Sequence, residues 1–307
     1  MKLLKRIALV ILGVLVISMT ACEKDNDVND QGLGLGQGQG QEPGSTTTVS
    51  KKISKVYYSY ESTNYQQEKT LVEVWEWNNN NFVDYINQYD GDQLEFMVSF
   101  TYDDKNRPSR VDCYRYNLYL NYYYNESDNM PNKLELFESN QMLGTCEIIS
   151  NNGKMERLNV TIYDNKKAAM LNPLSMLLPK PFASRLAAFE NHIAERNGNS
   201  AETYNIQLTW SNNNISKIIA QGQGDIITIT AQYDNKKCPV YAFLLGIPGG
   251  GGLIKNNPTS ITAIMNSYNP ETIIIDYQYD ASGYPIKATE YDADYQSHKE
   301  MLYFEYL

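Results

Sequence analysis

The stretch LEFMVSFTYDDKNRP, residues 94–108, decides the fold of this chain. In its first part, apolar side chains alternate with mostly polar ones. One side carries Leu94, Phe96, Val98, Phe100 and Tyr102. Successive side chains of a β-strand point to opposite faces, so this period of two predicts a half-buried strand. The polar run that follows ends in Pro108, which presets an extended start for the next strand.

The same alternation recurs along the chain. It appears in residues 158–162, 206–210, 227–233 and 273–279. Strands joined by short polar turns pair antiparallel, because parallel neighbours need long crossover connections. We therefore predict a mainly β fold, in which a long antiparallel meander curves into an open or closed barrel-like sheet.

A turn motif also repeats. Residues 102–108, 233–239 and 279–285 each read Tyr-Asp, four residues, Pro. The Asp side chain can accept backbone N–H groups two residues on, and Asn106 and Gly283 tolerate positive φ. Proline cannot donate to a strand ladder and so suits the first residue of a strand. We interpret the three segments as hairpin corners of an internal repeat and not as ligand loops.

Two insertions interrupt the strand pattern. Within residues 167–197, Phe182, Leu186, Phe189 and Ile193 follow helical spacing. This predicts one inserted amphipathic helix at about 183–196 that plugs or caps one opening of the sheet. The second insertion, residues 241–257, contains four consecutive glycines and is expected to be a mobile loop.

The first 50 residues have the features of an export segment and a tether. Residues 1–21 join a basic start to a short apolar run, which is typical of a signal peptide. The segment Met19-Thr20-Ala21-Cys22 resembles a bacterial lipobox, which implies lipidation of Cys22. Acidic residues 23–27 resemble the signal that sends Bacteroidota lipoproteins to the cell surface. Residues 22–50 continue into a Gly/Gln-rich coil. We therefore expect an outer-membrane lipoprotein at the cell surface, with a single β domain over residues 51–307.

Charge and cysteine content exclude several kinds of function. Loss of the 3 positive charges in residues 1–21 takes the net charge from −10 to −13. A chain this acidic, without a basic run after the leader, is not expected to bind nucleic acid. Cys113, Cys146 and Cys238 allow at most one disulfide within the chain, and their pairing stays open. Their spacing does not fit a metal site, so we expect neither metal nor cofactor.

The second half of the chain resembles a known family. Asn256-Asn257-Pro258-Thr259 lies between the corners at 233–239 and 279–285. This order resembles uncharacterised Bacteroidota lipoproteins that carry a domain of unknown function with a porin-like fold. The corners are also similar to the tyrosine-aspartate repeats of large bacterial wrapping proteins. The resemblance extends over residues 51–307 and implies a long antiparallel barrel-like sheet, without a known activity. Cys238 departs from the pattern, because a polar residue is expected there.

No catalytic constellation is present in the sequence. His192 and His298 lie outside any triad or metal motif, and no nucleophile elbow or phosphate loop occurs. Carboxylate pairs for glycan hydrolysis could be drawn at Glu73 with Glu76 or at Asp292 with Asp294. Acidic residues are too common in this chain for such pairs to carry information. We therefore predict that the protein is not an enzyme and assign no catalytic residue.

Aromatic side chains are the remaining candidates for a binding site. The sequence has 25 Tyr, and the N-terminal half is especially rich in aromatic residues. Candidate ligand-binding residues are Trp75, Trp77, Tyr114, Tyr116 and Tyr122. Exposed on a rigid sheet, such rings could bind a glycan or an envelope protein. The alternative is a structural envelope component without a small ligand, whose aromatics pack between strands. A glycan hydrolase is the third and weakest hypothesis.

Overall fold

A computed structural model describes residues 51–126, 128, 130–163, 202–238, 255–266 and 268–307. These residues form strands and one short 3-10 helix, η1 (Tyr114–Tyr116). The strands are β1 (Ile53–Ser62), β2 (Tyr65–Gln66), β3 (Thr70–Trp77), β4 (Val83–Asp90), β5 (Gln93–Tyr102), β6 (Pro108–Cys113), β7 (Leu118–Tyr123), β8 (Lys133–Glu138), β9 (Gln141–Asn151), β10 (Lys154–Ile162), β11 (Glu202–Ser211), β12 (Asn214–Gly222), β13 (Asp225–Tyr233), β14 (Pro258–Met265), β15 (Glu271–Tyr279), β16 (Pro285–Asp292) and β17 (Lys299–Tyr306). The signal peptide, Cys22, the tether and the helix predicted at 183–196 lie outside the described residues.

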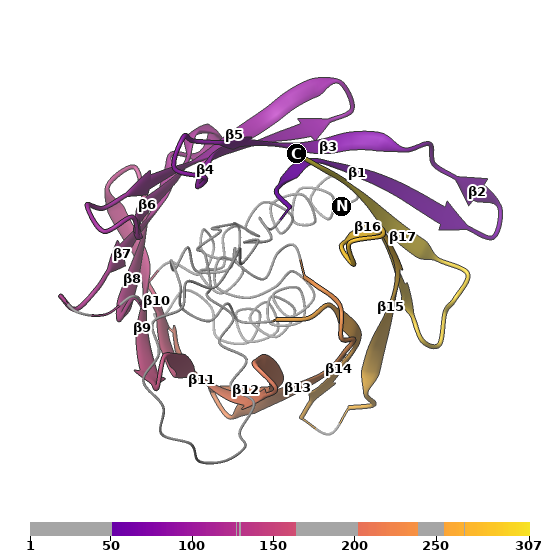
Figure 1. The fold of residues 1–307 in the computed structure, drawn as a ribbon. Coiled ribbons are helices and arrows are strands. Elements are labelled where there is room, and N and C mark those ends of the chain that lie inside the picture. Colours follow the sequence, from indigo (N-terminus) through magenta and orange to yellow (C-terminus); the bar gives the residue numbers. More distant parts are fainter. Residues whose placement is uncertain (1–50, 127, 129, 164–201, 239–254, 267) are drawn as a thin grey trace, which may run out of the picture.

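The strands close into a barrel (Figure 1). From β3 to β17, each strand pairs antiparallel with its neighbour along the chain, and β1 pairs with both β3 and β17. This makes a closed antiparallel barrel of 16 strands, with the two-residue β2 as one extra strand beside β1. The prediction of a mainly β meander is confirmed, and the sheet takes the closed form.

The two walls of the barrel differ in polarity. Leu158 and Val160 of β10 and Ile206 of β11 are fully buried, and these side chains belong to one apolar cluster that runs from β1 to β14. Nothing among the described strands covers the convex side of the barrel, so we assign this face to the concave inner wall. Alternation then places the intervening side chains on the outer wall.

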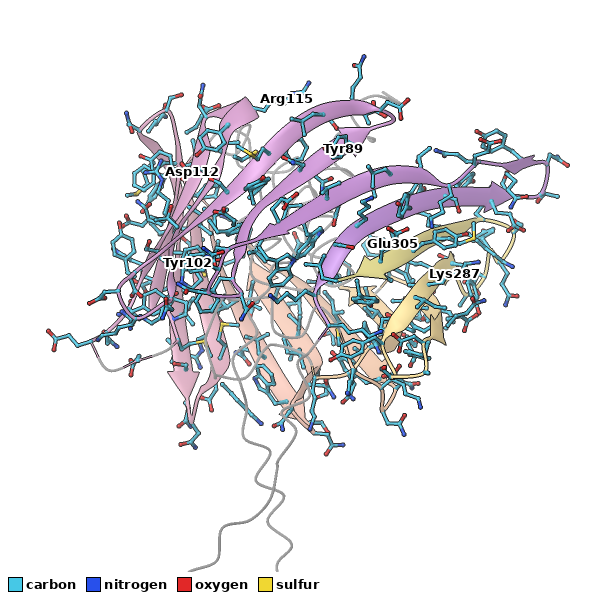
Figure 2. All side chains as sticks on the ribbon, turned by 45° about the horizontal axis from the view of Figure 1, so that its top comes forward. Tyr89, Tyr102, Asp112, Arg115, Lys287 and Glu305 are labelled. Atoms are coloured by element: carbon cyan, nitrogen blue, oxygen red, sulfur yellow. The ribbon has the colours of Figure 1, made fainter. Side chains whose placement is uncertain are left out.

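The outer wall mixes polar and charged side chains with aromatic and apolar ones. Its cross-strand rows include the Asn159–Asn205 and Thr262–Thr272 hydrogen bonds and also the stacked rings of Tyr119 and Phe137, whose centroids are 4.9 Å apart. Asp112, Lys287 and Glu305, labelled in Figure 2, lie on this wall. The outer wall therefore carries charged side chains among its aromatic and apolar ones.

Three corners at one end of the barrel share the same hydrogen bonds. Asp103, Asp234 and Asp280 each follow a strand-ending Tyr and donate their backbone N–H to the carbonyl just before a proline. One carboxylate oxygen of each Asp accepts the backbone N–H two residues on and the N–H of the residue before that proline. The same corner hydrogen bonds are therefore present after Tyr102, Tyr233 and Tyr279.

One corner differs from its prediction. The sequence pattern assigned Pro239 to the corner after Tyr233, but Tyr233 pairs with Pro258, which begins β14. Asp234 bonds to Asn257, just before Pro258, so residues 237–255 interrupt this corner. Without them the corner would read Tyr-Asp-Asn-Lys-Asn-Asn-Pro, close to Tyr-Asp-Asp-Lys-Asn-Arg-Pro at residues 102–108. The fixed spacing misled the prediction because an inserted segment happens to carry a proline at the expected position.

We name the two ends of the barrel by their strands. Rim A is the end where β1 begins and where β3, β5, β13, β15 and β17 end. It holds the three Asp corners and both ends of the domain, with the Leu307 N–H donating to the Lys52 carbonyl over 2.8 Å. Rim B is the opposite end and holds the β1–β3, β14–β15 and β16–β17 turns and η1.

Rim A is tied together by aromatic side chains. Seven of them donate a hydroxyl or indole N–H to a backbone carbonyl at the start of the neighbouring strand, over 2.6–3.1 Å. We call these bonds rungs. The donors are Trp77, Tyr102, Tyr124, Trp210, Tyr233, Tyr277 and Tyr306, and the acceptors are Ile53, Val83, Pro108, Met155, Ile215, Pro258 and Pro285. Burial raises the pKa of the tyrosine donors, so they remain neutral.

The three cysteines after Cys22 form no disulfide in the described structure. Cys113 and Cys146 are buried on the inner wall and Cys238 is half-buried near rim A. Burial raises the pKa of the Cys146 thiol, which keeps it protonated. In the part of the chain that the structure describes, no helix is long and apolar enough to cross a membrane.

Candidate binding surface at rim B

Three of the five predicted aromatics belong to the inner wall. Trp75 is 4% exposed, and its indole N–H donates to the Glu73 carboxylate over 2.8 Å. Trp77 forms the rung to Ile53, and Tyr122 is 9% exposed within the apolar cluster. These three side chains pack between strands, as the structural alternative anticipated for buried aromatics.

The other two predicted aromatics lie in η1 at rim B. The Tyr114 side chain is 58% exposed, and its hydroxyl oxygen accepts a hydrogen bond from the Ser99 hydroxyl over 3.1 Å. Tyr116 completes the same helical turn, and its side chain lies outside the described set. Neighbouring Arg115, labelled in Figure 2, pairs with Glu95 over 3.1 Å. The structure therefore does not bring the five predicted residues onto one surface, and a ligand role for them stays a prediction.

Exposed tyrosines gather instead in the turns of rim B. Tyr65, Tyr114, Tyr163, Tyr268 and Tyr295 are between 47% and 69% exposed. They belong to the β1–β3 turn, η1, the end of β10, the β14–β15 turn and the β16–β17 turn. A tyrosine in a turn supplies a large contact area at low entropic cost, because it has only two side-chain torsions. Rim B therefore carries the groups that binding loops commonly use.

Sequence reasoning missed four of these residues. Tyr65, Tyr163, Tyr268 and Tyr295 do not stand in the aromatic-rich segment around residue 119. Their signal is weaker: each lies in a polar segment, and all four adjoin Asn, Asp or Gln. No side-chain hydrogen bond joins Tyr65, Tyr268 or Tyr295 to another described residue.

The two carboxylate pairs drawn from the sequence do not form a cleft. Glu73 is buried, and its carboxylate accepts a hydrogen bond from the Trp75 indole N–H. Glu76 is exposed on the opposite face of β3. The Asp292 carboxylate accepts the Asp294 backbone N–H over 2.8 Å and so shapes the β16–β17 turn. Within the described residues, no group of three or more His, Cys, Asp or Glu side chains could hold a metal ion.

The histidine of rim B lies among aromatic rings. His298 is exposed in the β16–β17 turn, and its ring centroid is 6.2 Å from that of Tyr60 on β1. The Tyr60 ring is 6.5 Å from the Tyr65 ring. The pairing of β1 with β17 thus brings together aromatic groups from the first and the last strands of the domain sequence. His192 lies outside the described residues.

Comparison with known proteins bears on the fold alone. No family model matches the chain, and a search of curated proteins gives no match. Among solved structures, the chain is similar to a porin-like protein from Bacteroides vulgatus ATCC 8482, with a TM-score of 0.50 and 8% identity over 83% of this chain and 99% of that one. It is also similar to a porin-like protein from Bacteroides uniformis ATCC 8492, with a TM-score of 0.46 and 10% identity over 83% of this chain and 96% of that one. The porin-like fold expected from the sequence is supported at this level.

Proposed function

We propose that the protein is an outer-membrane lipoprotein of the cell surface, whose barrel lies in water and binds an envelope partner or a glycan through rim B. The proposal rests on the cluster of exposed tyrosines at rim B. At rim A, by contrast, the aromatic side chains donate hydrogen bonds to backbone carbonyls of neighbouring strands. The lipobox-like segment at Cys22 supports the anchoring part.

The charged side chains of the outer wall support a barrel in water. A barrel that spans a bilayer carries an apolar outer band with aromatic girdles. Here Asp112, Lys217 and Asp276 lie on the outer wall, and each would be costly in lipid. A lipid anchor would then supply the attachment that the barrel itself does not.

The position of the chain entry supports rim B as the binding end. Lys51 and Lys52 stand at rim A, where Lys51 pairs with Asp280 over 2.6 Å and the Lys52 ammonium lies 5.3 Å from the Trp77 ring centroid. An anchor at Cys22 would therefore join the domain from the rim A side. Rim B lies at the other end of the strands, which leaves it accessible to partners outside the cell.

The alternative of a structural component without a ligand also has support. Buried Trp75 and Tyr122 and the seven rungs show that many aromatics serve the framework. The structural alternative gives no reason for exposed tyrosines in five separate segments of one rim. We therefore favour binding, and the protein is not proposed to be an enzyme.

Capture from envelope extracts and glycan arrays tests this function. The full-length chain in detergent would be compared with a variant in which Tyr65, Tyr114, Tyr268 and Tyr295 are changed to Ser. We expect the parent to capture a ligand that the variant loses, and a Tyr123→Ser control on the outer wall to keep it. Equal capture by parent and rim B variant would refute the proposal, as would no capture by either in both screens.

A further inference from the structure

Closure of the barrel creates an aromatic cluster at rim B. Tyr60 lies near the end of β1, Tyr65 lies in the turn that follows, and His298 precedes β17. The ring of Tyr60 is tilted by 38° against Tyr65 and by 40° against His298. The backbone N–H of His298 donates to the Tyr295 carbonyl over 3.3 Å, so Tyr295 belongs to the same turn as His298. We call Tyr60, Tyr65, Tyr295 and His298 the seam cluster.

The seam cluster has carboxylates beside it. Glu300 on β17 stands directly opposite Tyr60 on β1, and on its other side it stands opposite Glu290 on β16. These three residues share one face of the sheet, since directly paired residues of antiparallel strands project to the same side. All three are partly exposed. Glu300 therefore places a carboxylate beside Tyr60 on a face that is partly open to solvent.

The lysines of this region lie on the other face. Lys299 precedes Glu300 on β17 and pairs with Glu61 and Tyr291, so its side chain points to the face opposite that of Glu300. The Lys69 ammonium lies 4.0 Å from the Tyr57 ring centroid and 4.9 Å from that of Tyr303, both on the outer wall. Neither lysine supplies positive charge to the face that carries Glu300.

Aromatic faces and carboxylates favour the same ligand charge. The π-face of a tyrosine carries partial negative charge and attracts ammonium groups, and the attraction adds to that of a nearby carboxylate. Anionic ligands would be repelled by Glu300 and by the net charge of −10. The seam turns are polar, with Asn64, Gln66 and Gln296 exposed, so an extended apolar ligand finds little surface there.

From this geometry we infer that the seam cluster binds an organic ammonium group. The inference rests on the proposed function, since it names the ligand chemistry of one part of rim B. The ammonium would lie against the Tyr60 and Tyr65 rings, with Glu300 compensating its charge. Two sources offer this chemistry: a lysine side chain of a partner protein, and an amino sugar of a surface glycan.

Titration with matched cationic and neutral probes tests the inference. The full-length chain in detergent would be titrated by calorimetry with a hexamer of glucosamine and with its N-acetylated form, which lacks the positive charges. A lysine-rich peptide and its acetylated form make the second matched pair. We expect at least one cationic probe to bind more tightly than its neutral counterpart, by at least about 5-fold, and to weaken as salt is raised. Tighter binding of the glucosamine hexamer would identify the glycan source, and tighter binding of the peptide the protein source.

Variants locate the site. Tyr65→Ala and Glu300→Gln should each lower the affinity for the preferred cationic probe by about 2- to 5-fold. This is the range expected for one exposed cation–π contact. Tyr123→Ala, on the outer wall and outside rim B, should leave the affinity of that probe unchanged. Equal binding of charged and neutral probes would overturn the inference, as would equal weakening of binding by Tyr65→Ala and Tyr123→Ala, or no binding of any probe. In those cases capture of a ligand by rim B in the screens above would leave the proposed function intact.

Discussion

The two rims of the barrel use tyrosine in opposite ways. At rim A, Tyr102, Tyr233 and Tyr306 stand at or near strand ends above the apolar inner wall, and their hydroxyls donate to carbonyls of neighbouring strands. At rim B, Tyr65 and Tyr295 stand in turns with more than half of the side chain exposed. The position of a tyrosine relative to strand end and turn decides whether it supports the barrel or is available to a ligand.

The largest expected effect is at an Asp corner of rim A. Arg107 is 8% exposed and pairs with Asp103 over 2.7 Å, so Asp103→Ala leaves a buried charge without its carboxylate partner. We expect a loss of about 3–5 kcal/mol in the free energy of unfolding, measured with urea. Asp280→Ala removes a similar corner whose partner, Lys51, is 37% exposed, and should cost about 1–2 kcal/mol. Equal losses in the two variants would contradict the assigned role of Arg107.

A smaller effect compares the rims directly. Tyr233→Phe removes one rung and leaves the Ile215 carbonyl without this donor, which should cost about 1 kcal/mol. Tyr295→Phe at rim B should change the free energy of unfolding by less than about 0.5 kcal/mol, because its hydroxyl bonds to no described residue. Thermal and urea unfolding of both variants would check the difference. A rim B loss as large as the rim A loss would show that the rims do not divide the tyrosines in this way.

Acid should weaken rim A. Burial by itself would raise the pKa of Asp103. The overall shift of this pKa is downward, because Arg107 contributes hydrogen bonds and positive charge and the Lys105 N–H donates a further hydrogen bond. The Lys51 ammonium and backbone N–H bonds lower the pKa of Asp280. A carboxyl whose folded pKa is depressed contributes stability that is present above its unfolded pKa of 3.8 and is lost as pH falls through the folded value. Urea unfolding below about pH 4 should show this loss. An Asp103→Asn, Asp280→Asn variant should show a flatter pH dependence there, and an unchanged slope would argue against the two corners as its source.

The smallest expected effect concerns the interrupted corner. Deletion of residues 237–255 joins Lys236 to Asn256 and restores the spacing found after Tyr102. Shorter loop closure costs less entropy, by about 0.6 kcal/mol for each halving of the loop, while contacts of Lys237 with Asn257 and Tyr284 are lost. We expect the barrel to fold with a stability within about 1 kcal/mol of the parent. Failure of the deleted chain to fold would show that the inserted residues are needed for the corner.

Local sequence pattern predicted the strands because their chemistry is local. The alternation in residues 94–102, 206–210 and 273–279 recurs in β5, β11 and β15. The Asp corners follow for the same reason, since each carboxylate bonds backbone groups of its own turn. The prediction failed at Pro239, where the true partner of Tyr233 lies beyond an insertion.

The candidate surface could not be predicted in the same way. Tyr60 and His298 are brought within 6.2 Å by the pairing of the first strand with the last, which no local pattern records. Trp75 and Tyr122 appeared equivalent to Tyr114 in the sequence, but strand register turns the first two to the inner wall. A following Asp or Asn marks the rung residues Tyr102, Tyr124 and Tyr233, but it also follows Tyr163 and Tyr268 at rim B, so this motif does not separate the two rims.

The closure of the barrel also sets its response to force. β1 is held on one side by β17 and on the other by β3, and the chain enters it at rim A. A pull between that entry and a ligand on rim B would run parallel to the strands. Interstrand hydrogen bonds of an antiparallel sheet are perpendicular to the strands, so they would be sheared together and not opened one at a time. Resistance to such a pull is set by the rate of forced unfolding. The seam between the first and last strands is thus also the mechanical clamp of the domain.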